Sequence, residues 1–234
     1  MPDHAVAVET TIAAPFATVW NALRDPAEIR RWHGWEYDAD GGLDAEIDVI
    51  YVQGVTADEA AGTITIGDGS RFEVEDRGAH TIVRITMPAP TAGLRWDDFY
   101  DDIREGWTSF VHQLRFALEQ HPGEERRTLQ LDGAGAAPAD ATAIGLDDRG
   151  AAYAGTTSWG EPLAGRVLFR TAHQVGLTVD SYGPGLVILH AKPPAKRPPD
   201  GGGMAIVTTY VLDDAAFAGL EGRWRAWWDE HYAG

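Results

Sequence analysis

The longest helical pattern in the chain covers residues 96–121. Its apolar positions recur at steps of three and four, which places them on one stripe of an α-helix. These positions are Ile103, Trp107, Phe110, Leu114, Ala117 and Leu118. Aspartates crowd its first turns, where the helix dipole favours negative charge, and Pro122 with Gly123 ends it. A helix of this length with one broad apolar face needs a wide surface to cover it, and the preceding segments predict a sheet.

Those preceding segments predict a strand, two helices and a run of antiparallel strands. The first strand covers residues 6–12, and Ala14 with Pro15 opens a helix that stops at Asp25. Asp25 can also cap a short second helix that ends at Arg31. Beyond Trp32 the period changes to two, and the strands expected there cover residues 33–37, 43–51, 64–66, 72–74 and 83–87. Glycine-containing turns separate the later strands, so antiparallel hairpins are expected.

The fold class predicted from this order is α+β, with the long helix laid across a curved antiparallel sheet and a cavity between the two. Residues 128–234 repeat the order in a degraded form. Strands are expected at 128–132, 166–169, 176–179, 186–190 and 205–211, a weak helix at 138–146, and a last helix after Asp213. The predicted organisation is therefore a complete domain over 1–122, a linker over 123–127 and a shortened copy over 128–234. We expect the shortened copy to lack some strands of the complete domain. Two alternatives are one continuous sheet shared by both halves and two half-domains docked face to face.

Charge and composition exclude several classes of partner. The 234 residues carry a formal net charge of -17, which disfavours nucleic acid and anionic membrane surfaces. The chain has no cysteine, and therefore no disulfide, thiolate metal site or cysteine nucleophile. The N-terminus shows no signal-peptide pattern and no apolar segment approaches bilayer-spanning length, so a cytoplasmic protein without a membrane partner is expected.

Motif searches leave general acid–base catalysis as the one open enzymatic chemistry. The eight histidines form neither an HxH nor an HExxH pattern, so no metal is expected. The glycine-rich pieces match neither a phosphate loop nor a dinucleotide pattern, so no cofactor is expected, and no nucleophile motif is present. A carboxylate, histidine or tyrosine buried in an apolar cavity would have a shifted pKa and could transfer protons. In the second half, Trp159 with Glu161 could form an aromatic wall beside such a group, although a turn with one packed tryptophan is the plainer interpretation.

The opening of the chain resembles a known family. The segment TIAAPFATVWNALRDPAEIRRW has Ala14-Pro15, Val19-Trp20, Asp25-Pro26 and Trp32 in the order seen in SRPBCC/START-type helix-grip domains. Among these it resembles homologues of the activator of heat-shock-protein ATPase, which also often carry the Gly-Trp pair found here at Gly106-Trp107. The resemblance covers residues 4–121. It implies a hydrophobic pocket that the long helix closes over the sheet, in a family that binds lipids, steroids and polyketides and includes cyclases, aromatases and co-chaperones.

On that resemblance we expect the chain to bind a hydrophobic small molecule, lipid-like or polyketide-like. The expected ligand-binding residues are Trp35, Tyr37, Tyr51, Trp107, Phe110, His112 and Leu114. Plainer interpretations exist: Tyr51 can be a core residue whose hydroxyl reaches a partner, and His112 can flank its helix without a ligand. Gly106 is expected to allow close approach of helix and sheet. Adjacent Trp227 and Trp228 point about 100° apart on a helix, so one should face the other half, a second subunit of a homodimer, or a ligand.

Two further functions stay open. One is a cyclase-like or aromatase-like enzyme that uses acid–base groups in the cavity, and the other is a co-chaperone-like interaction module. Ionisable side chains paired at the pocket would favour the enzyme, whereas an all-apolar lining would count against it.

Overall fold

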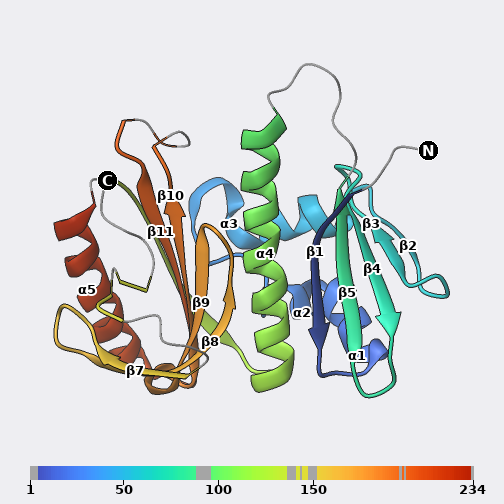
Figure 1. The fold of residues 1–234 in the computed structure, drawn as a ribbon. Coiled ribbons are helices and arrows are strands. Elements are labelled where there is room, and N and C mark those ends of the chain that lie inside the picture. The colour runs from blue at the N-terminus through green and yellow to red at the C-terminus, as the bar shows by residue number, and fades with distance from the viewer. Residues whose placement is uncertain are drawn as a thin grey trace. The chain divides into compact units, whose positions relative to one another are not determined.

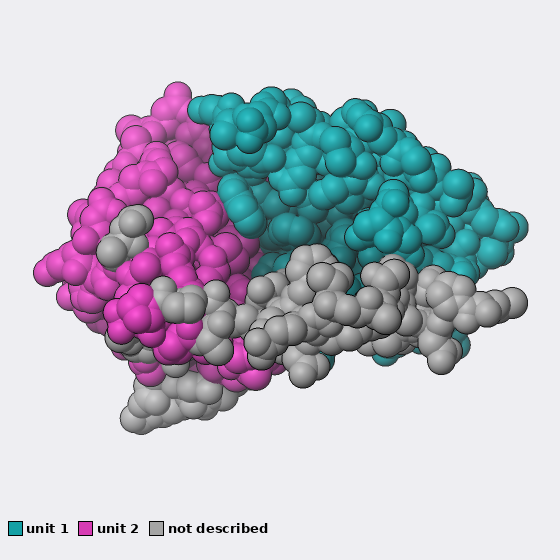
Figure 2. Space-filling model, turned by 90° about the horizontal axis from the view of Figure 1, so that it is seen from above, with its two compact units in different colours: residues 1–124 teal, residues 125–234 magenta. Residues whose placement is uncertain are grey.

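The chain divides into two units, Met1–Glu124 and Glu125–Gly234 (Figure 2). The computed structural model describes residues 5–87, 96–135, 141–142, 144–146, 152–194, 197 and 199–232. Each unit has its own antiparallel sheet, its own long C-terminal helix and its own apolar core. The prediction of an α+β helix-grip fold in tandem is confirmed in this arrangement of sheet, helix and core in each unit.

The first unit runs through one strand, a series of short helices, four strands and a long helix (Figure 1). These are β1 (Ala5–Ile12), α1 (Phe16–Arg24), α2 (Pro26–Arg30), η1 (Ala39–Gly41), α3 (Gly42–Ile47), η2 (Asp48–Val52), β2 (Thr56–Asp58), β3 (Thr63–Thr65), β4 (Arg71–Asp76), β5 (Thr81–Met87) and α4 (Trp96–Gln120). The strand order is β1-β5-β4-β3-β2, so the first strand lies beside the last one, and every pair is antiparallel.

The two faces of this sheet differ as the alternation in sequence predicts. One face buries Phe72 and Val74 of β4 with Val83 and Ile85 of β5, in one core with the apolar stripe of α4. The other face is charged, and Arg84 binds two carboxylates of neighbouring strands there, at Glu9 and Glu75. Because a long helix needs an apolar surface, α4 packs on the first face.

The segment 43–51 is helical, so its prediction as a strand is wrong. Leu43, Ile47 and Tyr51 are buried at steps of four, whereas Val49 is 59% exposed. A strand would have turned Val49 to the same face as the other three. The segment instead forms α3 followed by η2, a stretch of the wider π-helix. The strand expected at 33–37 is also absent, because these residues form an irregular connection from α2.

Two smaller expectations have clear outcomes. Asp25 caps α2 as predicted, since its carboxylate accepts a hydrogen bond from the backbone N–H of Ala27 at 2.9 Å. Gly106 does not serve close packing, because a Cβ at this position would meet no described heavy atom within 4 Å.

The second unit repeats the path of the first, with no helix among the described residues between its first two strands. Its elements are β6 (Arg126–Ala134), β7 (Ala152–Thr156), β8 (Pro162–Arg170), β9 (Gln174–Val179), η3 (Asp180–Tyr182), β10 (Gly185–Lys192), β11 (Gly202–Tyr210) and α5 (Asp214–His231). The strand order is β6-β11-β10-β9-β8-β7, again with the first strand beside the last. Among the described residues this sheet has six strands against five in the first, so the expectation of missing strands is wrong.

The helix expected at 138–146 is not observed in the part that is described. Residues 138–140 and 143 lie outside the described ranges, and the described residues between 141 and 146 form turns. In neither unit is a described helix long and apolar enough to cross a membrane.

Candidate functional site

The candidate site of the first unit is built around His33, at the end of α2. The backbone N–H of His33 still bonds back to the carbonyl of Ile29 at 2.8 Å, and the indole N–H of Trp32 donates to the carbonyl of Ala22 at 2.8 Å. Gly34 then turns the chain with a φ of 58°, and its carbonyl accepts from the side-chain amide of Gln113 on α4 at 3.0 Å. Helix α2 on one side and α4 on the other therefore fix the imidazole, which is fully buried.

His33 joins three other side chains in a hydrogen-bonded series that we call the polar network: Tyr51, His33, Glu46 and Tyr37. The hydroxyl of Tyr51 lies 2.8 Å from His33 Nδ1, and His33 Nε2 lies 3.2 Å from Glu46 Oε1. The hydroxyl of Tyr37 donates to Glu46 Oε2 at 3.0 Å. The network leads from Tyr51, which is 1% exposed, to Tyr37, which is 36% exposed.

The helical conformation of residues 42–52 makes this network geometrically feasible. Glu46 and Tyr51 are five residues apart, and the wider turn of η2 brings positions at that spacing onto one face. A strand would have turned Glu46 and Tyr51 to opposite faces of the sheet. Both side chains instead reach the two ring nitrogens of the same imidazole.

The electrostatics of the network favour an ionised Glu46. The hydrogen bond from His33 is the main cause that lowers the pKa of the Glu46 carboxyl, against the opposing effect of burial. Facing a carboxylate, Nε2 of a neutral His33 carries the proton, so Nδ1 accepts and the Tyr51 hydroxyl donates. Burial, reinforced by the charge of Glu46, raises the pKa of Tyr51 well above its usual value, so that phenol stays neutral. The pKa of Tyr37 is raised as well, by burial and by its hydrogen bond to Glu46.

Aromatic rings surround the buried end of the polar network. The ring of His33 lies 4.4 Å from that of Phe110 and 4.9 Å from that of Tyr51, centroid to centroid. Tyr51 continues to Phe72 at 6.2 Å, and Phe72 to Trp107 at 5.3 Å in an edge-on arrangement. The space between sheet and α4 at this level is therefore occupied by side chains, at ring distances typical of packed aromatic pairs.

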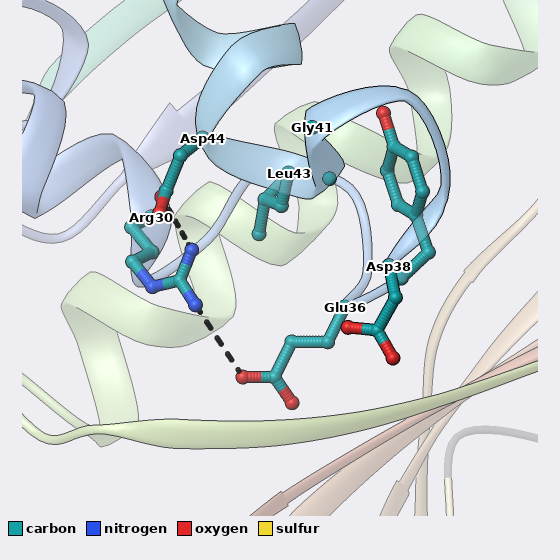
Figure 3. Close-up of a pocket in the computed structure, with 8 residues that line it drawn as sticks. Arg30, Glu36, Asp38, Gly41, Leu43 and Asp44 are labelled. Atoms are coloured by element: carbon teal, nitrogen blue, oxygen red, sulfur yellow. Dashed lines mark hydrogen bonds and ion pairs between the residues drawn. The ribbon is translucent and has the colours of Figure 1, made fainter.

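The exposed end of the network adjoins a pocket of about 530 Å³, the α3 pocket (Figure 3). Its lining residues are Arg30, Glu36, Tyr37, Asp38, Gly41, Gly42, Leu43 and Asp44. Figure 3 shows Arg30 between the carboxylates of Asp44 and Glu36. Its guanidinium lies 2.5 Å from Asp44 Oδ1 and 3.9 Å from Glu36 Oε1. Three acidic side chains against one arginine give the pocket a negative character, and a ligand that donates hydrogen bonds suits it better than an anion.

The structure brings together most of the residues expected from the sequence, in two groups. Trp35, Tyr51, Trp107 and Phe110 contribute to the aromatic cluster, with Trp35 and Phe110 rings 6.4 Å apart. Tyr37 lines the α3 pocket. Leu114 is a fully buried core residue. His112 belongs to neither the pocket nor the polar network, and burial lowers its pKa to about 4.

Two central residues, His33 and Glu46, were missed in the sequence. His33 lies in the segment that was taken for a strand, and Glu46 lies on the polar phase of the other misassigned strand. A helical interpretation of 42–52 would have placed Glu46 one turn from the buried positions and made it a candidate partner for a histidine. In the described ranges no group of three or more histidine, aspartate or glutamate side chains could hold a metal ion.

Three solved structures resemble the chain at low sequence identity. DynU16, a protein of the dynemicin biosynthetic locus, is 15% identical over 97% of this chain and 96% of its own, with a TM-score of 0.35. The di-domain ARO/CYC BexL from the BE-7585A biosynthetic pathway is 14% identical over 96% and 92%, with a TM-score of 0.38. The di-domain ARO/CYC StfQ from the steffimycin biosynthetic pathway is 14% identical over 91% and 86%, with a TM-score of 0.35. No protein-family model and no curated protein sequence matches the chain.

Proposed function

We propose that the first unit binds a small hydrophobic molecule that carries hydrogen-bonding groups, and that the polar network orients it. The observation that carries the proposal is the continuous series of hydrogen bonds from buried Tyr51 to the α3 pocket. A buried network of ionisable side chains costs desolvation that an apolar core avoids. Such clusters are therefore concentrated at functional sites.

The α3 pocket has a volume suited to a small ligand. About 530 Å³ lies within the range of small-molecule sites, roughly 300 to 1,000 Å³. Leu43 and the ring of Tyr37 offer apolar contact, and the surrounding carboxylates accept hydrogen bonds from ligand hydroxyl or amine groups. Residues 4–121 resemble helix-grip domains, including homologues of the activator of heat-shock-protein ATPase, in a superfamily that binds lipids, steroids and polyketides between the sheet and the long helix. Aromatic side chains fill that space here, so the α3 pocket is proposed on its own lining.

A second candidate function is acid–base catalysis on such a ligand, and the polar network favours it too. The Tyr37 hydroxyl lines the α3 pocket and donates to Glu46. It would accept a proton from a C–H group of a ketone substrate, leaving an enolate, while it passes its own proton to ionised Glu46, so that the network would work as a general base. The same side chains could hold a ligand without reaction, so the two functions need different measurements.

Binding is tested by isothermal titration calorimetry of the full chain with 2,6-dihydroxyanthraquinone, a planar hydrophobic molecule whose two hydroxyls are free to donate hydrogen bonds. Tyr37→Ala removes one wall of the pocket and a hydrogen bond to Glu46, so affinity should fall about tenfold. Val49→Ala removes an exposed side chain outside the pocket and is the matched control. Equal affinity for wild type and Tyr37→Ala would contradict the proposal.

Catalysis is tested by proton exchange at carbon. 2-Tetralone, an aromatic ketone with acidic C–H groups, is followed by proton NMR in deuterated water with and without the protein. An enzyme should accelerate the exchange, and Glu46→Gln should remove the acceleration while it keeps most of the binding. Exchange at the uncatalysed rate in the presence of bound wild-type protein would leave ligand binding as the function.

A further inference from the structure

The second unit has an aromatic cluster that joins α5 to the turn between β7 and β8. Figure 1 shows these elements as ribbons. The ring of Trp159, from that turn, lies 5.3 Å from Trp224 and 4.9 Å from Trp227, both on α5. Thr157 fixes the turn, since its hydroxyl accepts from the backbone N–H of Glu161 at 2.9 Å. Trp224 and Trp227 are buried, whereas Trp159 is only half-buried and keeps part of its surface accessible.

Glu161 and Arg223 form a fixed ion pair next to these rings. The Glu161 carboxylate accepts from Arg223 Nε at 2.9 Å, from Arg223 Nη2 at 3.4 Å and from the Trp159 indole N–H at 3.3 Å. Burial and the Glu161 carboxylate raise the pKa of the neighbouring Tyr182 well above its usual range, so Tyr182 stays a neutral phenol. The two hydrogen bonds to Glu161 hold the Arg223 guanidinium in one orientation, and the Glu161 carboxylate balances its charge.

His231 completes the cluster from the last turn of α5. Its ring stacks on Trp227 with centroids 4.8 Å apart and an interplanar angle of 30°. Its Nδ1 lies 2.8 Å from the backbone carbonyl of Trp227, which fixes the proton on that nitrogen. In the neutral ring Nε2 is then a hydrogen-bond acceptor.

These side chains line an open pocket of about 460 Å³, the tryptophan pocket. Trp159 and Ser158 come from the turn, and Arg223, Trp227 and His231 come from one face of α5. Ala226 stands on the same face, and its small side chain leaves the space between the others open. The volume lies in the range of small-molecule sites, roughly 300 to 1,000 Å³.

We infer that the tryptophan pocket is a second small-molecule site, for a planar aromatic compound that carries a hydroxyl donor. The accessible surface of Trp159 provides a flat aromatic contact, and the His231 imidazole provides an acceptor for the hydroxyl. The site is separate from the function proposed for the first unit, because no residue of the α3 pocket takes part in it.

Charge decides against an aromatic carboxylate. Arg223 is already neutralised by Glu161, and Glu230 adds a further negative charge to the lining, so an aromatic carboxylate would meet net repulsion. A neutral ring with a hydrogen-bond donor avoids this repulsion and still uses the His231 acceptor.

The test is calorimetric titration of the full chain with 2-naphthol, and in parallel with 2-naphthoate, which carries a carboxylate in place of the hydroxyl. We expect saturable binding of 2-naphthol and at least tenfold weaker binding of 2-naphthoate. Ala226→Leu fills the pocket from an exposed helix position and should weaken 2-naphthol binding at least tenfold. His231→Phe keeps a ring on Trp227 but removes the acceptor, and should weaken it about fivefold.

The matched control is Ala218→Leu, the same exchange at an exposed position of α5 outside the pocket, which should bind like the wild type. Tyr37→Ala should also bind 2-naphthol like the wild type, which separates this site from the α3 pocket. Equal loss in Ala226→Leu and Ala218→Leu would overturn the inference, as would an affinity for 2-naphthoate equal to that for 2-naphthol. Full retention of binding in Ala226→Leu would overturn it as well.

Discussion

Replacing Tyr51 by phenylalanine measures what the buried end of the polar network contributes to folding. Tyr51 is 1% exposed and His33 fully buried, so water cannot replace the hydroxyl that is removed. The exchange breaks the 2.8 Å hydrogen bond and leaves His33 Nδ1 without its donor. A buried polar atom that loses its partner costs about 1 to 3 kcal/mol, and we expect the free energy of unfolding to fall by about 2 kcal/mol.

A double-mutant cycle separates the hydrogen bond from the packing. His33→Leu removes the other partner, and the double variant leaves no unsatisfied atom between positions 33 and 51. The loss in the double variant should therefore be smaller than the sum of the single losses by about 1 to 2 kcal/mol. Tyr37→Phe is the matched control at the exposed end of the network, where solvent competes for Glu46, and it should cost less than about 1 kcal/mol.

The assay is urea unfolding followed by both far-UV circular dichroism and tryptophan fluorescence. Two probes are needed because the two units can unfold in separate transitions, in which case the first unit's transition is the one to fit. The slope of each transition should match the wild type, which shows that the same surface is exposed. A Tyr51→Phe variant as stable as the wild type, with additive single losses, would refute the account of the polar network.

Three further predictions concern stability. Ile47→Asp should unfold the first unit, because Ile47 is 3% exposed. Val49→Asp should change the free energy of unfolding by less than about 0.5 kcal/mol, because Val49 is 59% exposed. Equal destabilisation by both variants in urea melts would contradict the helix and support a strand at 43–51. Asp25→Ala should cost about 1 kcal/mol by loss of the α2 cap, with Asp25→Asn largely retaining it in the same melts. His112 has a folded pKa lowered from 6.5 to about 4, so the unfolded state binds more protons between these values and stability should fall by up to about 3 kcal/mol as pH drops through them. In His112→Gln the urea midpoint should fall less steeply as the pH is lowered. An unchanged pH dependence of the midpoint would show that His112 is not the cause of the acid destabilisation.

The elements predicted correctly are those in which one period dominates and one face is buried. The stripe on α4 repeats at helical steps through four turns, and its bounds were predicted to within a residue. In β4 through Glu75 and in β5 through Ile85, buried and half-buried positions alternate, and the two strands pair through a short turn. In these segments local pattern and tertiary burial agree, which is the condition under which periodicity is informative.

The prediction of a strand at 43–51 was wrong because the three strongest apolar positions of this segment fit the period of a helix as well as that of a strand. Leu43, Ile47 and Tyr51 are four residues apart, a spacing that lies on one face of a strand and of a helix alike. Only Ala45 and Val49 distinguish the two, and the strand assignment required both to be buried. Val49 is exposed, and alanine favours helices over strands, so the weaker apolar positions carried the decisive information.

That one assignment also determined how much of the candidate site could be predicted. The aromatic part depends on α4 and β4, which were recognised, so Trp107 and Phe110 were named from the sequence. The polar part depends on Glu46 and Tyr51 facing the same imidazole, which only the helical conformation allows. The sequence therefore predicted an apolar pocket with isolated polar candidates, whereas folding connects these candidates into one network that opens at the surface. Acid–base chemistry requires the ionised Glu46 of that network, whereas ligand binding depends mainly on the walls of the pocket, so Glu46→Gln is the change that distinguishes the two functions.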